Sequence, residues 1–380
     1  MKINNKKAGL YIHVPFCSKK CNYCDFYSFA ASDSLKKSYV DAVISHAKII
    51  SQNHPNTVFD TVFIGGGTPT ALGSELLCKL IEGVKSYLTI EPYAEFTIET
   101  NPGLCDVSDF KLIASLGVNR VSIGLQSANP EELMLLGRIH STDDYLRTLD
   151  TVRAAGIENV NTDIMFSLPS QTPELLSNTL EFVCRQAPSH ISAYALKIED
   201  GTPFAKMRDS FTLPDEDTDA DMYLQICDTL ASNGYEHYEI SNFAKNGFEC
   251  KHNLKYWNVE DYIGLGPAAH SCVNSVRYAY NRDINAYIKA FTEKCTESDV
   301  FSEYTEISEC EKAREKVMLG LRLSKGISES SLFSVSKSPA TEKNIRSLID
   351  CGYFRKTLNG YALTERGMYV SNSIINLFID

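Results

Sequence analysis

Two kinds of apolar segment alternate along roughly the first half of the chain. From the N-terminus to about residue 200, short apolar runs rich in β-branched residues are followed by longer amphipathic ones. This alternation is typical of repeated βα units, in which helices join parallel strands. The expected strands are 9–14, 61–64, 95–100, 120–125, 159–164 and 190–196, and the helical patterns between them include 35–50, 74–88, 143–155 and 173–185. Six strands are too few for an eight-stranded barrel. We therefore expect an α/β fold, a partial, open (β/α)6 TIM-like barrel with right-handed crossovers.

The remainder of the chain predicts two further regions. Residues 201–221 are rich in Pro, Asp and Thr, as linkers often are, and a Tyr- and Asn-rich stretch without clear periodicity extends to about residue 280. Beyond residue 306, three helical patterns precede an expected hairpin that turns at Asn359 and Gly360. We predict a core at 1–210, a linker and middle region at 211–300, and an α+β, winged-helix-like region at 301–380.

The charge balance argues against binding to nucleic acid. The chain has 48 acidic and 37 basic residues, a formal net charge of -11, whereas a grip on phosphates needs an excess of cations. No apolar run is long enough for a signal peptide or a membrane span. Nine of the 12 cysteines are scattered singly, as buried packing residues of a reducing compartment would be. We expect a cytoplasmic protein that binds small ligands or protein partners.

Three cysteines follow the first expected strand with the spacing C-x3-C-x2-C: Cys17, Cys21 and Cys24. Thiolates favour iron–sulfur clusters and zinc, and three of them would leave one iron of a cubane cluster open to a small molecule. The alternative is a structural zinc knot. Zinc sites usually pair two C-x2-C units or add a nearby histidine, and no fourth cysteine stands close in this sequence. The spacing therefore favours a cluster.

Polar residues recur where the expected strands end. The second strand runs into Gly-Gly-Gly-Thr-Pro-Thr at 65–70, the third ends at Glu99, the fourth at Gln126, and the fifth carries Asp163. Ligands of parallel βα folds bind at the carboxyl ends of the strands. A glycine triplet alone is more often a tight turn, and a single carboxylate can simply cap a helix. Repeated over several strands, however, these residues predict one polar mouth.

These motifs resemble the radical S-adenosylmethionine (SAM) superfamily, and within it the HemW group. The other matching segments are Ile-Glu-Thr-Asn-Pro (98–102), Ser-Ile-Gly-Leu-Gln-Ser (122–127), Leu-Gly-Arg-Ile-His (136–140), Asn-Thr-Asp-Ile-Met-Phe (161–166), Tyr-Glu-Ile-Ser-Asn-Phe-Ala (238–244) and His-Asn-Leu-Lys-Tyr-Trp (252–257). The resemblance implies that the three cysteines hold a [4Fe-4S] cluster whose open iron chelates SAM. It also implies SAM contacts from Tyr11, Tyr23, Gly66, Gly67, Thr68, Glu99, Gln126, Arg138 and Asp163. Ser167 and Ser170 depart from the pattern, because relatives usually have glycine there.

The resemblance leaves two functions of different classes. One is an oxygen-independent coproporphyrinogen III dehydrogenase, a radical enzyme related to HemN, and the other is a heme chaperone that delivers heme to apo-hemoproteins. The dehydrogenase characteristically has one more cysteine, where this chain has Phe26, and a longer segment before the first cysteine. Both departures favour the chaperone. Enzymatic activity stays open, a radical enzyme with another substrate is a third hypothesis, and a flavodoxin or ferredoxin is the expected electron donor.

The candidate heme residues are His252, Tyr256 and Trp257, which match the HNxxYW motif associated with heme in the chaperone group. Neutral imidazole is a good axial ligand of heme iron, and aromatic rings pack against porphyrin. On spacing alone, the alternative is that His252 satisfies backbone groups and Trp257 fills a core. The resemblance favours heme. Cys250, His13 and His270 are weaker candidates for ligands.

Overall fold

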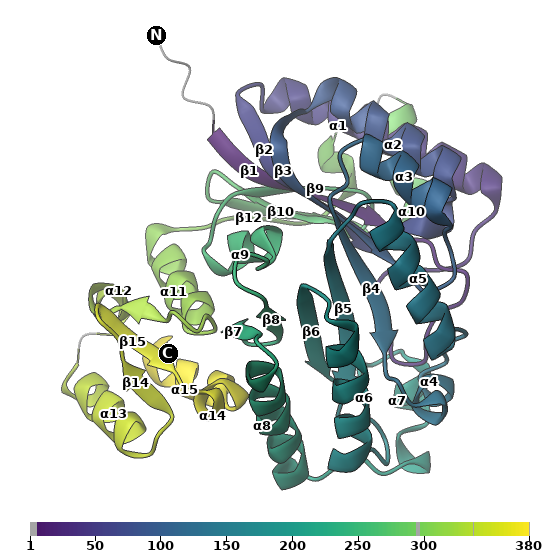
Figure 1. Cartoon of the computed structure of the whole chain (residues 1–380). Helices are drawn as coiled ribbons and strands as arrows, with labels where there is room; N and C mark the ends of the chain where they lie inside the picture. The colour runs from purple at the N-terminus through teal and green to yellow at the C-terminus, as the bar shows by residue number, and fades with distance from the viewer. Residues whose placement is uncertain (1–5, 294–296, 337, 380) are drawn as a thin grey trace. The chain divides into compact units, whose positions relative to one another are not determined.

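The computed structural model describes residues 6–293, 297–336 and 338–379 (Figure 1). The chain divides into two compact units. Unit 1 contains the chain up to Asp163, together with Lys197–Ser210 and Asp261–Glu306. Unit 2 contains Ile164–Leu196, Phe211–Glu260 and the chain from Ile307 onward. The domain boundaries expected at residues 210 and 300 stay a prediction.

Parallel strands form the centre of unit 1. The strands β1 (Lys6–Val14), β2 (Thr57–Gly66), β3 (Thr89–Thr100) and β4 (Arg120–Gln126) pair in parallel and in that order. β5 (Asn159–Phe166), of which the part up to Asp163 belongs to unit 1, lies beside β4. Each of the five expected strands lies inside an observed one. Since β1, β4, β5 and the second half of β3 are almost continuously buried, the apolar runs of the sequence become the sheet core. The expected α/β class is confirmed.

The helices of unit 1 follow the strands in sequence. They are α1 (Asp33–Asn53), α2 (Ser74–Tyr87), α3 (Val107–Ser115), α4 (Pro130–Leu135), α5 (Thr142–Ala154), α7 (Pro203–Lys206) and α10 (Ile284–Thr292), with short 3-10 turns at Pro69–Leu72, Arg208–Ser210 and Glu297–Val300. In Figure 1, α1, α2, α3 and α5 line one side of the strands. Local signals start them: Asp106 and Ser141 each form a capping box, which satisfies free N–H groups at a helix start. Within the described part of the chain, no helix has the length and apolarity needed to cross a bilayer.

The sheet of unit 1 extends beyond β1, which the sequence analysis did not predict. β9 (Tyr262–Leu265) pairs in parallel with β1, and β10 (His270–Val273), β11 (Val276–Tyr280) and β12 (Phe301–Glu306) continue the sheet in antiparallel order. These strands have only four to six residues each, too few for a clear alternation of apolar and polar positions. Their pairing makes β1 an interior strand.

Unit 2 combines a small α/β part with the C-terminal region. The first part contains α6 (Pro173–Gln186), β6 (His190–Ala195), α8 (Glu216–Ser232), β7 (Glu236–Glu239), β8 (Asn242–Ala244) and α9 (Lys251–Trp257), with β8 antiparallel to both β6 and β7. The second contains α11 (Glu309–Gly320), β13 (Ile327–Ser328), α12 (Glu329–Val335), α13 (Pro339–Asp350), β14 (Phe354–Lys356), β15 (Gly360–Leu363), α14 (Glu365–Tyr369) and α15 (Ser371–Ile379). The expected hairpin is β14 and β15, closed where Thr357 N–H donates to Gly360 O (2.8 Å).

Ser167 and Ser170, the two departures from the glycine pattern, keep the backbone conformation that glycine favours. Their φ angles are 57° and 61°, in the left-handed region. Local bonds hold each residue: the Ser167 hydroxyl donates to the Asp219 carboxylate, and Ser170 N–H donates to Thr212 O (2.9 Å). The loop therefore takes its shape with serine in place of glycine.

Candidate functional site

The candidate site of unit 1 lies at the carboxyl ends of β1 to β5, and its first component is a loop that carries three thiols: Cys17, Cys21 and Cys24. All three are half-buried and none forms a disulfide. Backbone bonds anchor the loop, since Cys17 N–H donates to Phe29 O (3.1 Å) and Asn22 N–H donates to Leu136 O (3.0 Å). Among the described residues, no three His, Cys, Asp or Glu side chains are grouped to hold one metal ion. The assignment to a cluster therefore rests on the spacing of the thiols and on the resemblance.

The glycine loop after β2 packs directly onto the cysteine loop. Thr68 N–H donates to Phe16 O (2.7 Å), and Gly66 N–H donates to Glu99 Oε2 (3.0 Å). A Cβ atom added to Gly67 would lie 2.6 Å from Phe16 O, so only glycine allows the two loops to approach this closely. Gly67 therefore serves the contact between the glycine loop and the cysteine loop.

Arg138 reaches into the same mouth from the turn after α4. Its Nη1 atom donates to Cys21 Sγ (3.6 Å), and Nη2 donates to Asn101 Oδ1 (2.8 Å) and to the carbonyl of Gly124. A Cβ atom on Gly124 would lie 2.9 Å from both Arg138 Nη2 and Gln126 Nε2, so this glycine leaves room for the two side chains. The Arg138 Nε atom is buried without a hydrogen-bond partner among the described residues. The Nε donor of the guanidinium is therefore left for an anionic ligand.

Two carboxyl groups complete this part of the site. Asp163 on β5 accepts hydrogen bonds from Ser122 Oγ (2.9 Å) and Asn161 Nδ2 (2.8 Å), which fix its orientation. Glu99 on β3 is half-buried; its partial burial, and secondly the negative charge of Asp163, raise its pKa to about 8. At neutral pH, Asp163 and a largely protonated Glu99 offer different hydrogen-bonding groups to a ligand.

Both predicted tyrosines are half-buried: Tyr23 lies within the cysteine loop, and Tyr11 lies on β1, which leads into it. Tyr11 Oη lies 3.0 Å from His13 Nδ1, and His13 Nε2 lies 2.9 Å from Tyr27 O. Because a carbonyl can only accept, Nε2 carries the proton and Tyr11 donates to Nδ1. Burial lowers the pKa of His13 to about 4, so the ring stays neutral. Burial also raises the pKa of Tyr23, although the nearby Arg138 cation opposes this.

The structure brings together the predicted cluster and SAM residues of unit 1, and it adds two that the sequence analysis missed. Asn101 and Ser122 bond directly to predicted site residues. Both lie inside the matched segments 98–102 and 122–127. Asn101 directly follows the end of β3, whereas Ser122 is the third residue of β4, so the signal that both share is their place in the matched segments. The donor set, three free thiols beside glycine backbone and an incompletely used guanidinium, fits a thiolate-bound cluster with a small amino-acid cofactor.

We expect the fold to become less stable as pH rises, because Glu99 loses its proton in a half-buried position. Its folded-state pKa of about 8 exceeds its ordinary value of 4.5, so its contribution is complete below pH 4.5 and is lost as pH rises through 8. Glu99→Gln does not titrate and should lose less stability between pH 6 and 9, by roughly a few °C in melting temperature. Thermal unfolding of the cluster-free protein measures this, with Glu82→Gln, an exposed carboxyl of the same unit, as control. An unchanged pH slope in Glu99→Gln would contradict the prediction.

The candidate heme motif lies in unit 2, on α9. His252 is 1% exposed, and its Nε2 atom lies 2.8 Å from Tyr256 Oη, with the two rings edge-on at 5.2 Å between centroids. The two side chains meet because they are four residues apart on a helix. Trp257 is half-buried, and Cys250 is fully buried with its N–H donating to Tyr238 Oη (3.2 Å). The imidazole that would bind iron is thus within hydrogen-bond distance of the Tyr256 hydroxyl.

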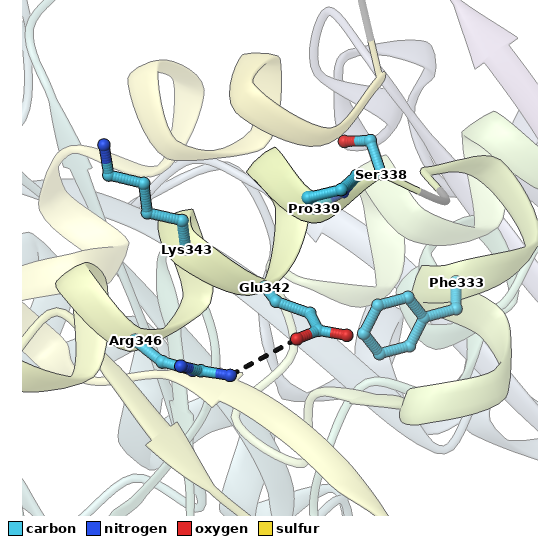
Figure 2. Close-up of a pocket in the computed structure, with 6 residues that line it drawn as sticks. All are labelled: Phe333, Ser338, Pro339, Glu342, Lys343 and Arg346. Atoms are coloured by element: carbon cyan, nitrogen blue, oxygen red, sulfur yellow. Dashed lines mark hydrogen bonds and ion pairs between the residues drawn. The ribbon is translucent and has the colours of Figure 1, made fainter.

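A separate hollow lies in the C-terminal region of unit 2, and none of the predicted site residues lines it. Figure 2 shows its lining, with Arg346 Nη2 donating to Glu342 Oε2 (3.3 Å) along α13 and Phe333 approaching from α12. Because this ion pair is exposed, it contributes little to stability. The side chains that line the hollow do not form a recognisable catalytic or metal-binding arrangement.

Two family patterns match the sequence. The Radical SAM superfamily pattern matches residues 11–183, and the HemN C-terminal domain pattern matches residues 307–370. Among solved structures, the fold is similar to coproporphyrinogen III oxidase (HemN) from Escherichia coli, described as a radical SAM enzyme, with a TM-score of 0.85 over 99% of this chain and 91% of that chain. The sequence identity is 21%, so this likeness concerns the fold.

Curated relatives match over nearly the whole chain. The heme chaperone HemW of Lactococcus lactis is 34% identical, and the match covers 98% of both chains. Proteins of the same name from Escherichia coli and Bacillus subtilis are 32% and 31% identical; the matches cover 98% and 97% of this chain, and 98% of each relative.

Proposed function

The chain belongs to the HemW family of the radical SAM superfamily, and we propose that it is a heme chaperone, which binds heme and transfers it to apo-hemoproteins. The observation that carries the proposal is the segment His252–Trp257 on α9, which matches the HNxxYW motif. It supplies an imidazole that can ligate iron and two aromatic rings that can pack against a porphyrin. The names of the curated relatives agree with this function.

We further propose that unit 1 binds a [4Fe-4S] cluster and SAM. When bound, the cluster supplies a redox-active iron with one position open to the amino and carboxylate groups of SAM. Arg138 would hold the carboxylate with its buried, unused Nε donor, and the backbone at Gly66 and Gly67 would receive the amino end. Glu99 and Asp163 would hold the ribose hydroxyls. The other proposed contacts are Tyr11, Tyr23, Thr68 and Gln126, with Cys17, Cys21 and Cys24 on the cluster.

The state of His252 bears on how heme would bind. Its Nε2 atom is within hydrogen-bond distance of Tyr256 Oη, and the side chain is buried. Ligation of iron through Nε2 therefore requires this contact to break and α9 to expose the imidazole. We propose that heme binding opens this part of unit 2, and that the Tyr256 hydroxyl competes with iron for the same nitrogen.

The alternative is coproporphyrinogen III dehydrogenase activity, which the complete polar rim of unit 1 would permit. Against it stands Phe26, at the position where the dehydrogenase has a further cysteine. The Phe26 side chain is 66% exposed, so it does not fill a core in unit 1. We also propose a flavodoxin or ferredoxin as electron donor and a cytoplasmic location.

We expect the anaerobically reconstituted protein to form no protoporphyrinogen from coproporphyrinogen III, SAM and a reductant. The heme-loaded protein should instead transfer heme to an added apo-hemoprotein, seen as the acceptor's Soret spectrum. Product formation is measured by chromatography, and an established dehydrogenase preparation serves as positive control. Multiple turnovers of coproporphyrinogen would overturn the chaperone proposal, and so would retention of all heme in the presence of excess acceptor.

A further inference from the structure

Asn101 lies between Thr68 and Arg138, and its side chain bonds to both. Its Nδ2 atom donates to Thr68 Oγ1 (2.9 Å), and its Oδ1 atom accepts from Arg138 Nη2 (2.8 Å). Thr68 Oγ1 lies 3.5 Å from Cys17 Sγ, and Arg138 Nη1 donates to Cys21 Sγ (3.6 Å). One side chain therefore connects the polar groups that touch two of the three thiols.

The direction of these bonds follows from their chemistry. A guanidinium can only donate, so the amide oxygen of Asn101 must face Arg138 and the amide nitrogen must face Thr68. Thr68 then accepts from Asn101, and its own hydroxyl hydrogen is left to point toward the sulfur of Cys17. Asn101 thus aims one O–H donor and one N–H donor at two sulfur atoms.

We infer that Asn101 is a positioning residue that raises the reduction potential of the cluster. Hydrogen bonds to cluster sulfurs stabilise the reduced state, which carries more negative charge. Asn101 acts through Thr68 and Arg138 and does not touch a thiol itself. A small cavity lined by Cys21, Asn101 and Arg138, among others, places the amide beside the cysteine loop. The inference rests on the proposed cluster.

The test is a redox titration of the reconstituted cluster in Asn101→Leu, which keeps the side-chain size but can neither donate nor accept. Loss of the two aimed donors should favour the oxidised cluster by roughly tenfold, which is a shift of about 59 mV to lower potential for one electron. The affinity for SAM, followed by its effect on the electron paramagnetic resonance spectrum of the reduced cluster, should also fall by roughly tenfold, because Arg138 loses one of the hydrogen bonds that orient its guanidinium.

Asn119→Leu is the matched control. Asn119 accepts from Phe96 N–H (2.9 Å) and donates to Ala94 O (2.8 Å), near the start of β4 and away from the thiols. Its replacement should lower the melting temperature but leave the potential of the cluster unchanged. A purely structural role of Asn101 predicts the same outcome for both variants.

Asn101→Asp covers the case in which Asn101→Leu fails to assemble a cluster. The carboxylate keeps the bond to Arg138 but has no hydrogen for Thr68, and its charge disfavours reduction, so the potential should again fall. Wild-type potential in either variant would overturn the inference. Iron analysis of the reconstituted wild-type protein comes first. If it finds no [4Fe-4S] cluster, the proposed cluster itself is contradicted, whatever the variants show.

Discussion

Replacing Cys21 with alanine is expected to abolish the [4Fe-4S] cluster. Three thiolates are the minimum that holds a cubane cluster with one open iron, and Cys21 is also the thiol to which Arg138 Nη1 donates. Loss of one ligand should reduce bound iron and the broad absorbance of the cluster by roughly tenfold or more. Replacing a residue that only hydrogen-bonds to a metal ligand already weakens metal binding by about tenfold, and a ligand itself should matter at least as much. SAM binding should disappear with the cluster. Iron and sulfide analysis after anaerobic reconstitution measures the effect.

Cys105→Ala provides the control for Cys21→Ala. Cys105 is another half-buried thiol of unit 1, but burial and nearby carboxylates raise its pKa to about 12. A protonated thiol is a poor metal ligand, so this variant should retain full iron content. Full iron content in Cys21→Ala, or an equal loss in both variants, would contradict the ligand assignment.

The second large effect is expected at His252. His252→Ala removes the proposed axial ligand, and we expect heme affinity to fall by roughly tenfold or more, with loss of the Soret shift on titration of heme. The cluster absorbance should stay intact, because the thiols lie in unit 1 and His252 in unit 2. Unchanged heme affinity would place the heme site elsewhere.

Tyr256→Phe is the companion variant, because it keeps the imidazole and the aromatic ring but removes the hydroxyl. In the wild-type protein this hydroxyl lies 2.8 Å from His252 Nε2. Without this hydroxyl, His252 Nε2 can ligate iron without first breaking a hydrogen bond. Heme should therefore bind at least as tightly as in the wild type. Weaker binding would show that the hydroxyl supports the heme-bound state and does not compete with it.

The strands of the core were predictable because each is long and apolar enough to be recognised without its neighbours. β1 to β5 contain 7 to 12 residues, and their buried runs are visible directly in the sequence. β9 to β12 were not predictable in the same way. They are short, and what makes them strands is hydrogen bonding to β1 and to one another, a non-local interaction that no local pattern records.

The candidate site shows the same division. Cys17, Cys21 and Cys24 were identifiable because ligand type and spacing lie within eight consecutive residues. Asn101 was not, since its partners Thr68 and Arg138 are 33 and 37 residues away along the chain. A lone asparagine after a strand has many uses, and only its two contacts distinguish it.

The sequence by itself determined the α/β class, the family, the three thiols and the HNxxYW segment, because each depends on residues that are close together in the chain. Only the tertiary structure decided that Gly67 must lack a side chain, that Asn101 joins Thr68 to Arg138, and that His252 is buried against Tyr256. The physical reason is that burial and hydrogen-bond partners depend on which elements meet in space.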